Sequence, residues 1–292
     1  MATVAGVADT DRGFSWKRMA WRVRALPIIP ALILAAVVIM AVFAPWLAPH
    51  DPATMDLPKK LIPPFQEQTY WLGTDHMGRD VLSRVIFGAR ISLLVGFLSI
   101  GLAGAIGCAL GLAAGYLGGR WDTAIMTVVN VQMSVPALVL AVLLAAVIGV
   151  GLLNIIIVIG IIYWTFYARI VRGEAMAIKG LDYVVMAGIN GCGPVRIMFT
   201  HVLPNLVPSI IVMATLQLGT AIIAEAALSF LGLGVQPPDA AWGLMLADGR
   251  LYITKAFWLA FFPGLAITVT VLGANLLGDW LRDTLDPKRR QV

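Results

Sequence analysis

One carboxylate, Glu225, lies well inside a long apolar run of this 292-residue chain. An ionisable group in such a run is expensive to bury unpaired and is by default a candidate for function. Three uses are open for it: the lining of a polar path or gate, a proton site, or a structural pair near a membrane interface. Asn130, Gln132 and Asn275 place further polar side chains in apolar surroundings and are candidates for lining the same path.

The residues needed for hydrolytic, metal or nucleotide chemistry are absent from the sequence. No Gly-Lys dipeptide occurs, so the chain lacks the G-x-x-x-x-G-K-[ST] loop that cradles nucleotide phosphates. H-E-x-x-H, C-x-x-C and G-x-S-x-G are missing as well. Cys108 and Cys192 have neither metal-ligand spacing nor a disulfide pattern. We expect no catalytic residue, no metal site and no cofactor on this chain, so that any energy comes from a partner or an ion gradient.

The composition is that of a membrane protein. Hydrophobic residues make up 60% of the chain and charged residues 13%, against about 25% charged residues in soluble domains. Helices that cross roughly 30 Å of hydrocarbon need about 20 apolar residues. Six runs qualify: 28–48, 91–116, 123–148, 152–171, 206–232 and 258–280. The sequence therefore predicts an all-α, polytopic membrane protein with six transmembrane helices, although Asn130, Gln132, Ser134 and Pro136 interrupt the third run.

The basic residues indicate the orientation. With the N-terminus in the cytoplasm, 14 of the 21 Lys and Arg residues lie on the cytoplasmic side, as the positive-inside rule requires. Both termini are then cytoplasmic, and the net charge of +5 reports topology; no nucleic-acid partner is expected. The run after the basic N-terminus is too long for a cleaved signal peptide. The predicted organisation is a cytoplasmic segment 1–27, a first transmembrane helix 28–48, an external segment 49–90, a core transmembrane domain 91–282 with a cytoplasmic segment 172–205, and a cytoplasmic tail 283–292.

Two local patterns make structural predictions. Gly107, Gly111 and Gly115 recur every fourth residue, which places them on one helix face where another helix can approach closely. Thr74 and Asp75 are residue types that begin helices, and Asp80 precedes Arg84 by four residues, the spacing of a side-chain pair on a helix surface.

The cytoplasmic segment 172–205 combines short helical stretches with Gly and Pro breaks, which favours an ordered element that docks on a partner. Gly191 follows Asn190 and is expected to turn the chain through backbone angles that a Cβ atom would resist. Val184, Val185 and Ile189 are expected to share an apolar face that enters a groove of the partner.

This segment resembles a family signature. Val185-Met186-Ala187, Gly191, His201 and Leu203-Pro204 are similar in spacing to the E-A-A, G, I, L-P motif of ABC-importer permeases, with Val185 in place of Glu and His201 in place of Ile. Three further blocks resemble the second permease of dipeptide, oligopeptide and nickel importers: L-G-T-D-H-M-G-R-D-V-L-S-R from residue 72, A-E-A-A-L-S-F-L-G-L-G-V-Q-P-P-D-A-A-W-G from 224, and N-L-L-G-D-W-L-R-D-T-L-D-P from 275.

The resemblance implies a type I ABC importer in a bacterial plasma membrane. Such a chain, surrounded by membrane lipid, pairs with a homologous permease and sits on two ABC ATPase subunits, which bind ATP and Mg. An external solute-binding protein delivers a dipeptide, an oligopeptide, a nickel chelate or another small solute. The resemblance makes 181–198 the coupling region. The residues it assigns to coupling are Asp182, Tyr183, Val184, Val185, Ala187, Gly188, Ile189, Gly191, Arg196, His201, Leu203 and Pro204.

A gradient-driven secondary transporter or channel that uses Glu225 as a proton site is the alternative function. It explains the helical bundle and the carboxylate. It leaves the cytoplasmic segment and the C-terminal block unexplained, and the sequence shows no internal inverted repeat of the kind common in secondary transporters.

Overall fold

The computed structural model describes residues 27–285, and within this range every regular element is a helix. Most of the predicted segments 1–27 and 283–292 therefore lie outside the described residues. The chain order of the helices is α2 (Ile28–Val42), α3 (Ala44–Leu47), η1 (Leu57–Lys59), α4 (Val81–Leu117), α5 (Gly119–Met133), α6 (Ala137–Ile148), α7 (Leu152–Lys179), α8 (Asp182–Ile189), α9 (Pro194–Ile197), the π-helix η2 (Met198–Val202), α10 (Leu203–Phe230), α11 (Trp242–Gly249), η3 (Arg250–Tyr252) and α12 (Trp258–Leu285).

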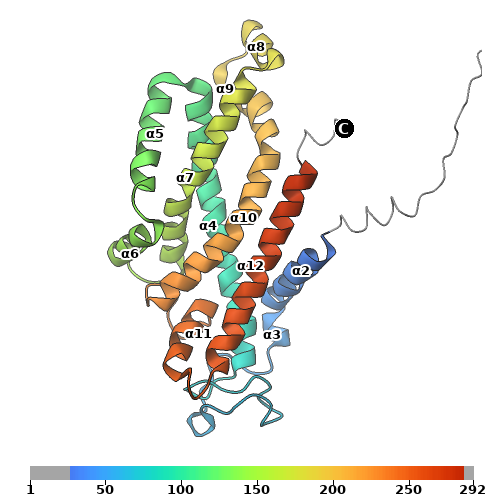
Figure 1. Cartoon of the computed structure of the whole chain (residues 1–292), viewed down its shortest axis with the longest axis vertical. Helices are drawn as coiled ribbons and strands as arrows, with labels where there is room; N and C mark the ends of the chain where they lie inside the picture. Colours follow the sequence, from blue (N-terminus) through green and yellow to red (C-terminus); the bar gives the residue numbers. More distant parts are fainter. Residues whose placement is uncertain (1–26, 286–292) are drawn as a thin grey trace, which may run out of the picture.

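The long helices α4, α7, α10 and α12 run side by side along the length of the molecule (Figure 1). The short helices α8 and α9 lie at one end, which we call the α8 end. Helix α11 and the segment from residue 48 to residue 80 lie at the other, which we call the α11 end. The loops that can meet partners are thus divided between the two ends of one helical bundle.

Four helical stretches are long and apolar enough to cross a membrane unaided. They are α4, α7, α12 and the stretch from Pro194 to Phe230, which contains α10. The predicted runs 91–116, 152–171, 206–232 and 258–280 fall almost entirely in these helices. Helix α2 is apolar but has 15 residues, shorter than the predicted run 28–48, because the chain breaks at Phe43 before α3. Two of the predicted boundaries fall inside helices: α4 begins ten residues before 91, and α7 continues to Lys179, into the predicted segment 172–205.

The predicted transmembrane run 123–148, which polar residues and Pro136 interrupt, is divided into two helices. Helices α5 and α6 occupy this run and meet at an angle of 93°, as a broken span or a re-entrant loop does. The break falls at Ser134 and Val135, directly before Pro136. Proline lacks the amide hydrogen that a continuing helix needs, and it disfavours the helical conformation in the residue before it. Figure 1 shows α6 turned away from α5 beside the lower part of α7.

The glycine stripe lies in the contact between α4 and α7, so the prediction of a close helix approach is confirmed. A Cβ atom at Gly111 would lie 2.5 Å from the carbonyl oxygen of Ala168, and one at Gly107 would lie 2.4 Å from that of Trp164. Only a residue without a side chain allows the two backbones this approach. The contact between α4 and α7 is the most extensive one between two helices in the described part of the chain.

Helix α4 begins later than the Thr74 and Asp75 signal suggests. Asp80 is its N-cap residue, and its carboxylate accepts hydrogen bonds from the Ser83 amide at 3.1 Å and the Ser83 hydroxyl at 2.6 Å. The predicted pair between Asp80 and Arg84 is wrong, because the Asp80 carboxylate is engaged in this cap. Arg84 lies 3.7 Å from the carboxylate of Asp75, which also pairs with Arg79 at 2.6 Å.

Tryptophans fasten the α11 end together. The indole of Trp242 donates a hydrogen bond to the Val85 carbonyl oxygen at 2.9 Å, and that of Trp258 donates to the Thr74 carbonyl oxygen at 3.3 Å. These bonds join α11 and α12 to α4 and to the segment before it. The segment from residue 48 to residue 80, which contains five prolines between residues 49 and 64, is therefore attached to this end of the bundle as a cap.

Candidate functional site

Helix α8 is held at its end of the bundle by a small apolar cluster. Val184 and Ala187 are buried, at 3% and 9% exposure, and belong to one cluster with Ile197, Val202 and Leu206. Residues of α4 and α7 complete this cluster. The coupling segment predicted from the sequence is thus a packed element whose core includes residues of α7 and α10.

The turn after α8 has the geometry predicted for Gly191. Its φ angle is +82°, a left-handed conformation that favours glycine. The Gly191 amide donates to the Gly188 carbonyl oxygen at 3.0 Å, and the Cys192 amide donates to that of Ala187 at 3.1 Å. This pair of bonds is the Schellman motif, in which a glycine closes a helix. The prediction of a glycine-dependent turn is confirmed.

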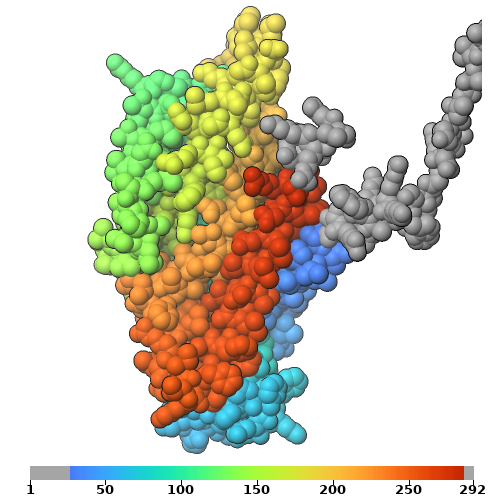
Figure 2. All heavy atoms as spheres, viewed as in Figure 1, coloured from blue at the N-terminus to red at the C-terminus, as the bar shows by residue number. Residues whose placement is uncertain are grey.

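The outward face of α8 is apolar. Val185, Met186 and Ile189 are exposed by 48%, 58% and 73%, and Tyr183 beside them is exposed by 46%. The yellow residues of this region project beyond the ends of the neighbouring helices in Figure 2. Apolar side chains gathered on a projecting helix are typical of a surface that a partner covers. Met186 was not among the predicted coupling residues, although its position next to Val185 was the available signal.

The predicted face of Val184, Val185 and Ile189 is wrong in one member. Val184 points into the cluster, whereas Val185 and Ile189, four residues apart, point outward. Successive residues of an α-helix point in directions about 100° apart. Of two neighbours such as Val184 and Val185, the surface on which the helix packs can therefore bury one and leave the other exposed. A short helix with apolar residues on both sides leaves this choice to its tertiary contacts.

The π-helix η2 contains His201 and joins α9 to α10. The His201 ring stacks on the ring of Tyr183, with centroids 6.4 Å apart, and its Nδ1 atom lies 2.6 Å from the Thr200 hydroxyl. The Asn205 amide donates to the Tyr183 hydroxyl at 3.0 Å. Tyr183 on α8 is thus tied to η2 and to the first turn of α10. A π-helical turn is a local irregularity frequent at functional sites.

The remaining predicted coupling residues surround this core. Asp182 begins α8, Leu203 and Pro204 begin α10, and Arg196 lies in α9. Asp182, Gly188, Arg196 and Pro204 are exposed. The structure therefore brings the predicted coupling residues together at the α8 end, and their role in coupling stays a prediction.

Glu225 is fully buried in the contact between α10 and α4. Its carboxylate accepts hydrogen bonds from the hydroxyl of Ser229 at 2.8 Å and from that of Ser92 at 3.2 Å. Within the described part of the chain no basic side chain pairs with it. This geometry gives Glu225 a structural use, the joining of two helices, and its use in a solute pathway stays a prediction.

The other three pathway candidates do not gather around Glu225. The amide of Gln132 donates to the carbonyl oxygen of Ile161 at 2.7 Å and accepts from the indole of Trp164 at 3.0 Å, so it ties α5 to α7. Asn130 accepts from Arg169 at 3.1 Å. Asn275 lies on α12, where its side chain faces Gly219 of α10. Asn130 and Gln132 thus lie in the contact between α5 and α7, and Asn275 lies in the contact between α10 and α12.

Comparison with known proteins gives the family. Residues 107–291 match the family model described as binding-protein-dependent transport system inner membrane component, and residues 16–64 match the N-terminal TM domain of oligopeptide transport permease C. The chain is 42% identical to a probable D,D-dipeptide transport system permease protein of Escherichia coli strain K12, over 94% of this chain and 92% of that protein. The chain belongs to this permease family.

Two other relatives differ in the solute they are named for. A di/tripeptide transport system permease of Pseudomonas aeruginosa is 45% identical over 89% of this chain and 88% of its own. A nickel transport system permease of Escherichia coli K12 is 39% identical over 91% and 94%. The protein is therefore a permease subunit of the dipeptide, oligopeptide and nickel group of ABC importers, as its motifs indicate.

The fold agrees with this assignment. A solved structure of the MetNI methionine ABC transporter, in an inward-facing conformation, matches with a TM-score of 0.58 over 70% of this chain and 97% of the other, at 19% identity. The family is one of ATP-driven importers, so the alternative of a gradient-driven transporter or channel is not supported. Membership in it also implies an ATPase and a solute-binding protein as partners.

Proposed function

We propose that this permease carries short peptides through a bacterial plasma membrane, in a complex with one homologous permease, two ABC ATPase subunits and an external binding protein. ATP and Mg are held by the ATPase subunits. The α8 end faces the cytoplasm, with both termini, and the α11 end faces outward. The positive-inside distribution of Lys and Arg supports this orientation. Relatives named for dipeptides and tripeptides support the peptide as solute.

The observation that carries the coupling role is the division of α8 into two faces. Val184 and Ala187 anchor the helix to the permease, while Val185, Met186 and Ile189 are left for a partner. In this proposal a groove of the ATPase encloses the outward face of α8. When the ATPase moves α8, the inner face of α8 carries the movement to α7 and α10. This is helix-in-groove recognition, in which residues three and four apart act as anchors.

Coupling is tested in a reconstituted complex of both permeases, the ATPase subunits and the binding protein, with ATP and radiolabelled solute. Val185→Asp places a charge on the outward face and should reduce solute-stimulated ATP hydrolysis and uptake together, while the complex of the two permeases still forms. Full uptake by this variant would show that α8 is not the coupling helix.

The solute is tested in the same vesicles by supplying labelled dipeptide or labelled nickel to parallel samples. ATP-dependent uptake of the dipeptide is the expected result. Uptake of nickel without the peptide would reject the peptide as solute and leave the family assignment unchanged. Because the family includes permeases named for both solutes, this comparison is the direct measurement.

A further inference from the structure

A pocket with both polar and apolar walls opens between α7, α10 and α12 near the α8 end, with about 430 Å³ of space. This volume lies within the roughly 300–1,000 Å³ typical of pockets that hold small ligands. Its polar lining comes from Glu174 of α7, Asn205 and Ser209 of α10, and Arg282 of α12, and Ile170 and Met213 are among its apolar walls. Three helices far apart in the sequence therefore contribute to one cavity.

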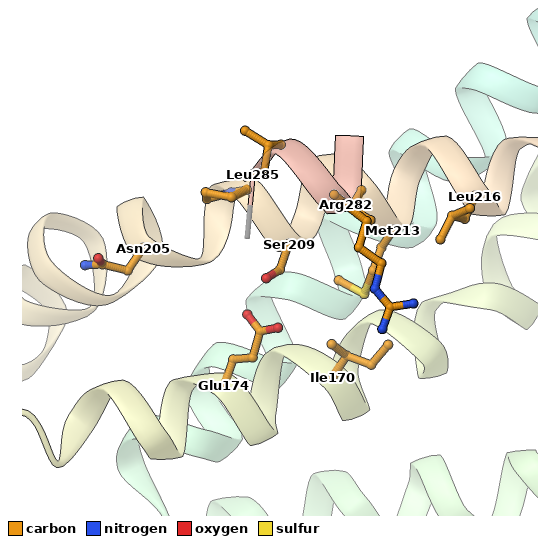
Figure 3. A pocket seen from close by; sticks show the side chains of 10 residues that line it. Ile170, Glu174, Asn205, Ser209, Met213, Leu216, Arg282 and Leu285 are labelled. Carbon is orange, nitrogen blue, oxygen red and sulfur yellow. The ribbon is translucent and has the colours of Figure 1, made fainter. Parts of the chain in front are cut away.

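The two charges of the pocket have opposite sign and face the same space. In Figure 3 the Glu174 side chain extends from α7 towards Ser209, and the Arg282 guanidinium extends from α12 towards α7. No ion pair joins them, and within residues 27–285 neither side chain has a hydrogen-bond partner. A carboxylate and a guanidinium that share a cavity without pairing with each other can bind two groups of a ligand. The carboxylate can bind a cationic group and the guanidinium an anionic group.

We infer that this pocket binds a short peptide as a zwitterion, at the place where the solute leaves the permease; this rests on the proposed function. The α-ammonium group of the peptide pairs with Glu174 and its terminal carboxylate with Arg282, whose planar fork matches a carboxylate. The Ser209 hydroxyl can hydrogen-bond a peptide group. The Asn205 side-chain oxygen can accept from a peptide amide, since the Asn205 nitrogen already donates to Tyr183 and His201. The apolar walls accept side chains without selecting among them, as a transporter of varied peptides requires.

The position of the pocket implies weak binding. Glu174 is half-buried and Arg282 is exposed, so water competes for both charges. A site of this kind at the proposed cytoplasmic end would be occupied by peptide that has already crossed the membrane. Binding to the pocket does not need the external binding protein. It can therefore be measured in the absence of that protein, independently of solute delivery.

The test measures equilibrium binding of radiolabelled alanyl-leucine to the complete permease and ATPase complex in lipid nanodiscs, without binding protein or nucleotide. The N-acetylated and the C-amidated dipeptide serve as probes that each lack one charge. We expect saturable binding of the free dipeptide, weakened about tenfold or more by either modification, which corresponds to about 1.4 kcal/mol. Equal binding of all three probes, or no saturable binding, would overturn the inference without any mutation.

Substitutions then assign the charges. Glu174→Gln should weaken binding of the free dipeptide about tenfold or more and leave binding of the N-acetylated dipeptide unchanged. Arg282→Gln should also weaken binding of the free dipeptide about tenfold or more and leave binding of the C-amidated dipeptide unchanged. Asp279→Asn and Arg120→Gln remove equal charges from exposed positions outside the pocket lining and should bind like the unmodified protein. Equal losses in all four variants would reject a specific pocket.

Uptake by the fully reconstituted importer separates this inference from the function on which it rests. If the importer takes up the dipeptide but substitution of Glu174 or Arg282 does not change dipeptide binding, the binding pocket is rejected and the proposed function stands. Binding that depends on both residues in a complex that does not transport the dipeptide would support the pocket and reject the peptide as transported solute.

Discussion

Replacement of Gly111 by alanine tests the physical basis of the α4 and α7 contact. The added Cβ atom would lie 2.5 Å from the carbonyl oxygen and 2.9 Å from the Cα atom of Ala168. Carbon atoms pack at roughly 3.5–4.0 Å, so α7 would have to move by about 1 Å. The obstructing atoms belong to the backbone, so a change of side-chain rotamer cannot relieve the contact.

The size of the effect follows from two opposing contributions. Overpacking of a close contact costs about 1–3 kcal/mol. The exchange of glycine for alanine in a helix contributes up to about 1 kcal/mol in the opposite direction. Gly101 on the same helix provides the control, because a Cβ atom there meets nothing within 4 Å. Gly111→Ala should therefore be less stable than Gly101→Ala by about 1–3 kcal/mol, since the helix-propensity gain is common to both.

The assay is unfolding of the full chain in mixed detergent and lipid micelles by increasing sodium dodecyl sulfate, followed by tryptophan fluorescence and circular dichroism. Gly111→Ala should unfold at a lower fraction of the denaturing detergent than Gly101→Ala. Coincident unfolding curves for the two variants would refute the argument that backbone approach at Gly111 holds these helices together.

Three further predictions concern other parts of the molecule. On α8, Val185→Asp should leave the free energy of unfolding within about 0.5 kcal/mol of that of the unsubstituted chain, whereas Val184→Asp should reduce it by several kcal/mol because it buries an unpaired charge. Detergent unfolding compares the two variants, and equal stability would contradict the division of α8 into two faces. Glu225→Ala should reduce the free energy of unfolding by about 1–3 kcal/mol, because it leaves the hydroxyls of two buried serines without their acceptor, and Glu225→Gln should reduce it less. An unchanged unfolding curve for Glu225→Ala would show that these hydrogen bonds do not contribute to stability. In a variant free of native cysteines, a cysteine at Asp239 should react with an impermeant reagent in intact cells and one at Asp182 only after permeabilisation, and the opposite pattern would reverse the proposed orientation.

Local features of this protein could be predicted from its sequence because their causes are local. The length and apolar character of the runs that became α4, α7, α10 and α12 follow from the thickness of the membrane. The spacing of Gly107, Gly111 and Gly115 required a close neighbour, although it could not say that the neighbour is α7. Gly191 turns the chain because glycine alone enters left-handed backbone angles without cost.

The tertiary structure decided whatever depends on which surface lies next to a residue. Val184 and Val185 are neighbours of the same type, and only the cluster beneath α8 determines that the first is buried and the second exposed. The sequence marked the break before Pro136, but the packing of α5 and α6 against α7 sets the angle of 93°. Glu174 and Arg282 carry no signal in their own surroundings, since a shared pocket exists only once α7 and α12 pack beside α10.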